Sequence, residues 1–166
     1  MTRARIEVLL ADHDLASRRV SNAIQGLTED DYYWKPIPEA FTLKDLVPQP
    51  QSGISTIEWK LAHLALAKMR YARLLLREAH EKTRGEILAC HTMEHMLAYV
   101  EQAHETMRRA IDSLSDEVLN EEGPTGWPKP RDSAPILPTL MWRINHDVYH
   151  AGQIATVRAL HRALRR

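Results

Sequence analysis

The sequence predicts an all-α protein, a four-helix bundle with long crossover connections. Three observations support this fold class. Glycine is scarce, at 6 of 166 residues, and long stretches are rich in alanine, leucine, arginine and glutamate, which favour helices. Apolar residues recur at spacings of three and four, the period of an amphipathic helix. The prolines gather in two connections, residues 35–54 and 120–138, and strand-like alternation is absent.

The first long helix is predicted over roughly residues 3–26. An apolar stripe at helical spacing marks it: Ile6, Leu10, His13, Ser17, Val20, Ile24 and Leu27. The segment from Thr28 to Asp31 then has the pattern of a capping box, which predicts a short helix before Trp34 and Pro36.

Three further long helices follow. The second begins at Ser55, because Ser55 and Glu58 form an S-x-x-E capping box, and it runs to about Ala79. The third spans residues 84–113, with Gly85 as a weak point, and a short helical turn follows over residues 113–119. The last helix opens near Pro138 or Thr139 and continues almost to Arg166.

The two proline-rich connections are predicted to be loops. Proline removes a backbone donor and is excluded from a helix interior. Both loops exceed the usual helix-to-helix length of about 2–8 residues, and such long connections are often functional or cross the bundle. We therefore expect a crossover between the third and fourth long helices.

Length and charge predict one soluble domain over residues 1–166. The chain has 22 basic and 22 acidic residues and a pI near 7.1, which does not favour nucleic acid or an anionic membrane as a partner. Cys90 is the single cysteine, so an internal disulfide is impossible. The first residues do not form a signal-peptide core, and no apolar run approaches the roughly 18 residues of a membrane span. We expect a cytoplasmic protein.

Nine histidines are the unusual feature of the composition. His146 and His150 stand four apart in INHDVYHAGQ, so on a helix they project from one face and could chelate one metal ion. His91 and His95 have the same spacing in HTMEH, so the spacing alone does not identify a site.

The neighbours of each histidine pair favour His146 and His150 as ligands. These two share a side with Trp142, away from the main apolar stripe of their helix, so this helix is apolar on more than one side and is expected to be buried between two surfaces. Buried histidines need partners, and a metal ion would supply one. His91 and His95 instead lie among Thr92, Glu94 and Glu101, which is typical of a solvated face.

A third ligand is expected from a neighbouring helix, and His63 is the best candidate. It lies two turns into the second long helix, on a face with Trp59, Ala67, Arg70 and Leu74. The alternative for a histidine among leucines is a satisfied core residue without a ligand role.

Longer motifs surround these three histidines. STIEWKLAHL, from Ser55 to Leu64, has the form S-x-[IV]-x-W-x-x-x-H-L. The last helix has H-x-x-x-H-x-G-Q from His146 to Gln153, followed by an arginine, Arg158. Together with LLADHDLASRRV in the first helix, these segments resemble the DinB/YfiT-like family of metal-dependent enzymes over most of the chain. The resemblance implies a four-helix bundle, one divalent metal on His63, His146 and His150, and frequent homodimers.

Three protein ligands leave a coordination position open, as in catalytic metal sites. Zinc or nickel is the expected ion, since imidazole suits both. An open position allows activation of water or binding of a thiol, and the resemblance implies both kinds of chemistry: a metal-dependent hydrolase or a thiol-dependent transferase acting on a small molecule, with a low-molecular-weight thiol as one candidate. Gln153, Asp147 and His13 are candidates to hold the ligating rings, and no general base is assigned.

Two alternatives belong to other classes of protein. A ferritin-like di-iron site needs two E-x-x-H motifs, but the chain contains only Glu101–His104, so this reading is disfavoured. The stronger alternative is a non-enzymatic bundle, metal-binding or stress-responsive, in which the histidines secure a dimer or sense a metal. Self-association is expected in either case, from the apolar sides of the last helix and from the resemblance.

Overall fold

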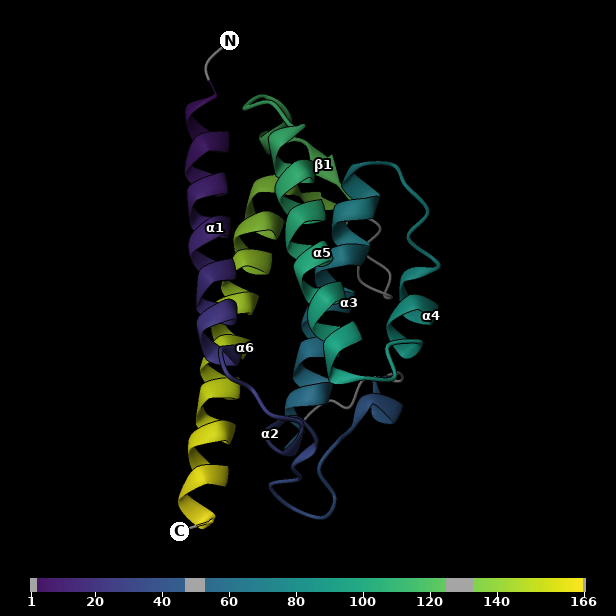
Figure 1. The fold of residues 1–166 in the computed structure, drawn as a ribbon. Coiled ribbons are helices and arrows are strands. Elements are labelled where there is room, and N and C mark those ends of the chain that lie inside the picture. Colours follow the sequence, from purple (N-terminus) through teal and green to yellow (C-terminus); the bar gives the residue numbers. More distant parts are fainter. Residues whose placement is uncertain (1–2, 47–52, 125–132, 166) are drawn as a thin grey trace.

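The computed structural model describes residues 3–46, 53–124 and 133–165. Within them, four long helices form a bundle (Figure 1): α1 (Ala4–Ile24), α3 (Ile57–Leu75), α5 (Met93–Asp112) and α6 (Ile136–Leu164). Shorter elements connect them: α2 (Glu29–Tyr33), η1 (Leu43–Asp45), α4 (Thr83–Leu88), η2 (Val118–Asn120) and an antiparallel pair of two-residue strands, β1 (Glu122–Gly123) and β2 (Ala134–Pro135). The predicted all-α fold class is confirmed.

The four long helices form a ring in which α1 packs on α5 and α6, and α3 packs on the same two helices. Helices α1 and α6 run in one direction, and α3 and α5 run in the other (Figure 1). Residues 76–92, including α4, return along the outside of the bundle so that α5 can start beside the start of α3. The return along the bundle therefore lies between α3 and α5. The connection predicted as a crossover, between α5 and α6, instead joins two helix ends at the same end of the bundle (Figure 1).

A helix cap accounts for the difference between the predicted and the observed start of α3. Thr56, not Ser55, caps α3: its Oγ1 accepts a hydrogen bond from the Trp59 amide at 3.1 Å. The Glu58 carboxylate does not close a capping box with Ser55 but accepts a hydrogen bond from the Leu43 amide at 2.9 Å. The predicted short helix after Thr28 is confirmed as α2, and Thr28 Oγ1 accepts from the Asp31 amide at 3.1 Å.

The predicted third helix over residues 84–113 is interrupted and forms two helices, α4 and α5. Thr92 begins the second one, because its side chain accepts a hydrogen bond from the His95 amide at 3.2 Å. Helix α6 begins at Ile136, earlier than predicted. Pro138 lies in its first turn, where the missing N–H would have no helical partner in any case.

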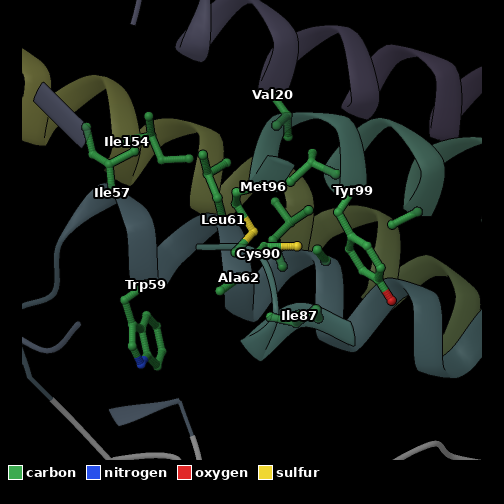
Figure 2. Close-up of a cluster of buried hydrophobic side chains, with 14 of the residues drawn as sticks. Val20, Ile57, Trp59, Leu61, Ala62, Ile87, Cys90, Met96, Tyr99 and Ile154 are labelled. Carbon is green, nitrogen blue, oxygen red and sulfur yellow. The ribbon is translucent and has the colours of Figure 1, made fainter. Parts of the chain in front are cut away.

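Two apolar clusters fill the bundle. The first, shown in Figure 2, surrounds Leu61, Met96 and Ile154 near the start of α3 and the end of α1. The second surrounds Tyr71 and Ile111 near the start of α1 and α6. Some of the buried polar residues come from the middle parts of the four long helices: His13, His63, Lys68, His104, Asp147 and His150. Among the described helices, none combines the length and the apolar character that a membrane crossing requires.

Candidate metal centre

The structure brings the three predicted ligands together. His63 comes from α3, and His146 and His150 come from successive turns of the antiparallel helix α6. The Nε2 atom of His146 lies 3.0 Å from Nε2 of His63 and 3.0 Å from Nε2 of His150. All three ligand atoms fall within 4.8 Å of one another, a group that could hold a metal ion.

Burial keeps these imidazoles neutral. His63 and His150 are buried, and His146 is partly buried. Burial is the largest cause of the lowered pKa values, which fall to about 3 for His63, about 2 for His146 and about 4 for His150. The three imidazole rings are therefore uncharged at neutral pH. Neutral imidazole is the form that binds metal ions.

Hydrogen bonding at His150 identifies the nitrogen that faces the cluster. Its Nδ1 lies 2.8 Å from the Gln153 side-chain oxygen, which can only accept, so Nδ1 carries the hydrogen and donates it. The Nε2 atom of His150 then presents a lone pair toward His146. A hydrogen on one Nε2 atom can form a hydrogen bond with only one of the other two Nε2 atoms, so a repulsive contact between lone pairs remains. One cation would instead bind the lone pairs of all three Nε2 atoms.

The spacing of the nitrogens fits a metal ion. Zinc–nitrogen distances of about 2.0–2.1 Å in a tetrahedral site place two ligating nitrogens about 3.3 Å apart. The observed separations of 3.0 Å are close to that value. The donor set, the protonation state and the spacing of these residues all fit a bound divalent ion.

Aromatic rings hold the imidazoles in place. Trp59 stacks on His63 with ring centroids 4.8 Å apart and an interplanar angle of 6°, and Trp142 stacks on His146 at 5.2 Å. Trp59 is buried, whereas Trp142 is 49% exposed. Because His146 is the least buried of the three histidines and Trp142 is half exposed, the solvent side of the cluster lies beside these two residues on α6.

Only one of the three candidate supporting residues contacts a ligand as predicted. Gln153 binds His150, but Asp147 forms a buried ion pair with Lys68 of α3. His13 instead donates a hydrogen bond from its Nε2 to the backbone carbonyl of His104, 3.0 Å away. Both Asp147 and His13 thus belong to a neighbouring polar layer.

This polar layer was not predicted from the sequence as a unit. Lys68 of α3 contacts both Asp147 of α6 and Nδ1 of His104 of α5, and the Ser17 hydroxyl of α1 lies 3.0 Å from the same Nδ1. A signal was present in the segment LALAKMRYA, where Lys68 interrupts an apolar stretch within a predicted buried helix. A buried lysine requires such partners.

The competing histidine patterns lie elsewhere. His91, between α4 and α5, and His95, in the first turn of α5, are both exposed, as their polar neighbours predicted. In the E-x-x-H motif, Glu101 is exposed while His104 is buried in the polar layer. This separation gives no support to the di-iron reading.

Comparison with known protein families agrees with the geometry. The model of the DinB superfamily matches residues 12–154, which include the three histidines and parts of all four long helices. The chain belongs to the DinB superfamily. A search of curated proteins finds no match to it. Membership of the superfamily is compatible with metal binding at the three histidines and does not name a reaction.

Arg158, the arginine of the DinB-like motif, holds neighbouring parts of the chain together, and within the described residues it forms no hydrogen bond with the three histidines. The Arg158 guanidinium donates to the backbone carbonyls of Ala23 at 2.6 Å, Gln25 at 3.0 Å and Gly26 at 2.9 Å. These carbonyls lie in the last turn of α1 and directly after it, where acceptors lack helical partners. Arg158 Nε also lies 3.5 Å from the buried Asp31 carboxylate. Arg158 therefore fixes the end of α1 and the start of α2 against α6.

Proposed function

We propose that this protein binds one divalent cation, zinc or nickel, through Nε2 of His63, His146 and His150. The observation that carries the proposal is the convergence of three neutral Nε2 atoms, two pairs of them 3.0 Å apart, in a buried site. Imidazole nitrogen suits both ions, so their relative availability decides which one is found in purified protein.

We further propose that the bound ion serves a reaction on a small molecule, either a hydrolysis or a transfer that uses a low-molecular-weight thiol. Three protein ligands leave one coordination position of the ion open. When bound, the ion would act as a Lewis acid toward a water or a thiol in that position. The protein's own residues orient the ligands: Gln153 fixes the tautomer of His150, and Trp59 fixes the ring plane of His63.

A specific observation favours the alternative, a metal-binding or stress-response bundle without catalysis. Asp147 follows the proposed ligand His146 in the sequence. Its carboxylate is buried and already forms an ion pair with Lys68. A carboxylate in that position is not free to accept a proton from a bound water, so it is a poor general base.

The first experiment measures metal stoichiometry. Protein stripped with a chelator is titrated with Zn²⁺ and Ni²⁺ by calorimetry, and the bound metal is quantified. We expect one ion per chain, and none bound stoichiometrically in His150→Ala, because two imidazoles remain. The double variant His91→Ala/His95→Ala, which alters a pair of the same spacing on the surface, is the matched control and should bind as the unaltered protein does. Binding that survives His150→Ala but is lost in the control would contradict the proposal.

A second measurement separates the enzyme from the alternative. Co²⁺ replaces the bound ion, and its visible spectrum is recorded with and without a small thiol. A spectral change on adding thiol shows an exchangeable position, which the catalytic proposal requires. An unchanged spectrum together with one tightly bound ion per chain would favour the non-catalytic bundle.

A further inference from the structure

A buried lysine, Lys60, lies three residues before His63 on α3, so one helical turn separates the two side chains. Lys60 is only 5% exposed, and its Nζ donates hydrogen bonds to the backbone carbonyl and to the hydroxyl of Ser55. A lysine ammonium has three hydrogens, so these two contacts leave one hydrogen for another acceptor. Within the described residues, no carboxylate forms an ion pair with this ammonium. A buried charge of this kind favours a ligand of opposite charge.

The ammonium of Lys60 is charged at neutral pH and acts on the histidine cluster. Burial lowers the pKa of Lys60 to about 8, which leaves most of the side chain protonated at pH 7. Burial is also the main cause of the lowered pKa values of His63 and His150, and the positive charge of Lys60 contributes to both. The ammonium therefore lies within electrostatic range of two of the three candidate ligands.

Other charges near the cluster have the same sign. After burial and the neighbouring imidazoles, Arg143 contributes to the lowered pKa values of His63 and His146, and Lys68 contributes to that of His146. Arg143 and Lys68 are buried, and both interact with one carboxylate, that of Asp147. Neutral imidazoles add no negative charge, so a bound divalent ion would make the centre still more positive. An anionic ligand would offset this charge.

We propose that Lys60 binds the anionic group of a small molecule whose other end occupies the open coordination position of the metal ion. The site then selects small anions over neutral and cationic molecules of similar size. Ser55, which is itself buried, holds the Lys60 ammonium in place, so little side-chain freedom is lost when the ligand binds. This inference rests on the proposed metal site and narrows its substrate to an anionic small molecule.

The test uses three thiols of similar size and different charge on the Co²⁺-loaded protein: mercaptoacetate, β-mercaptoethanol and cysteamine. The visible spectrum of Co²⁺ reports binding, and a titration gives each dissociation constant. We expect mercaptoacetate to bind about tenfold or more tightly than β-mercaptoethanol, because a hydrogen bond between charged groups contributes at least that factor. Cysteamine should bind most weakly. Acetate and acetamide form a second pair of probes, for a site that takes an oxygen ligand instead of a thiol.

Lys60→Met keeps a long side chain and removes the charge. Its preference for mercaptoacetate over β-mercaptoethanol should fall to within about threefold, and the ratio between the two proteins cancels the intrinsic differences between the thiols. Lys60→Arg keeps the charge and should retain the preference. Lys82→Met is the matched control, since it makes the same substitution at an exposed position before α4, and it should behave as the unaltered protein does.

The affinity for Co²⁺ separates a binding role of Lys60 from a purely structural one. Removing a positive charge near the cluster should tighten Co²⁺ binding in Lys60→Met while it weakens binding of the anion. A variant that only loosened the start of α3 would weaken both. If circular dichroism shows that Lys60→Met does not fold, Lys60→Gln replaces it, because its amide can still donate to Ser55.

The outcomes distinguish this inference from the metal site on which it rests. One Co²⁺ per chain in the unaltered protein and in Lys60→Met, with the same preference among the probes in both, overturns the role of Lys60 and leaves the metal site intact. The absence of any preference for the anionic probes in the unaltered protein has the same meaning. If Co²⁺ does not bind stoichiometrically to the unaltered protein, the metal site and the role of Lys60 are both overturned.

Discussion

Gln153 decides which nitrogen of His150 faces the other two imidazoles. Its side-chain oxygen accepts the Nδ1 hydrogen at 2.8 Å, so the Nε2 lone pair is directed toward His146 and His63. Without this acceptor, His150 could carry its hydrogen on Nε2 and would have to change tautomer before binding a cation. Such supporting contacts commonly contribute 10–100-fold to metal affinity.

We predict that Gln153→Ala weakens Zn²⁺ binding by about 10–100-fold and leaves the stoichiometry at one ion per chain. Gln153→Glu keeps an acceptor at the same reach and should restore most of the affinity. Competition with a zinc-chelating dye measures both variants. An affinity for Gln153→Ala equal to that of the unaltered protein would show that the contact with His150 does not select its tautomer.

The ligands themselves could be predicted from the sequence, but their supporting residues could be predicted only in part. His146 and His150 share one helix face by spacing alone, and Gln153, three residues from His150, lies within reach on the same helix. Asp147 is as close in sequence but points into the bundle, where Lys68 of α3 meets it. That pairing depends on how α3 packs against α6, which spacing within one helix does not determine.

At the scale of elements, the start of α3 sets the position of His63. Thr56 Oγ1 accepts a hydrogen bond from the Trp59 amide at 3.1 Å and donates one to the Phe41 carbonyl at 3.1 Å. The cap thus joins the first turn of α3 to the long connection before it. The prediction placed this cap at Ser55. The parallel bridge of Ser55 with Phe41 instead keeps residue 55 extended, so the helix starts one residue later.

We predict that Thr56→Ala lowers the free energy of unfolding by about 1–2 kcal/mol, the usual effect of removing a helix cap. Thr56→Ser keeps the hydroxyl and should lose clearly less, so the difference between the two variants isolates the hydrogen bonds. Urea unfolding followed by circular dichroism gives both values. Equal losses in the two variants would assign the effect to the methyl group and not to the cap.

At the scale of the whole molecule, helix periodicity predicted the four long helices, because each has apolar side chains at helical spacing that must be buried. It did not predict that α3 and α5 run in the same direction. The predicted third helix is broken where Thr92 caps the start of α5. The sequence around Thr92, ACHTMEH, contains no proline or glycine, so it is also compatible with a continuous helix. Direction follows from that break, since residues 76–92 then return along the bundle.

The middle of the bundle links folding to pH. Besides the three candidate ligands, His13 and His104 are buried in the polar layer, and burial lowers the pKa of His13 to about 4 and that of His104 to about 2. In the unfolded chain both titrate near 6.5. Between these values the unfolded chain binds more protons than the folded one. The folded state therefore has its full stability above about pH 6.5 and loses it as the pH falls toward 4.

We predict that the free energy of unfolding of the metal-free protein is nearly constant above pH 7 and falls steadily between pH 6.5 and 4.5. Each buried histidine contributes a slope of up to about 1.4 kcal/mol per pH unit in that window. His13→Gln removes one such group while keeping a side chain that can donate to the His104 carbonyl, so its slope should be shallower by up to that amount. Urea unfolding at a series of pH values measures both slopes. A stability that stays flat or rises as the pH falls through this window would mean that the histidines in the bundle become protonated without unfolding it.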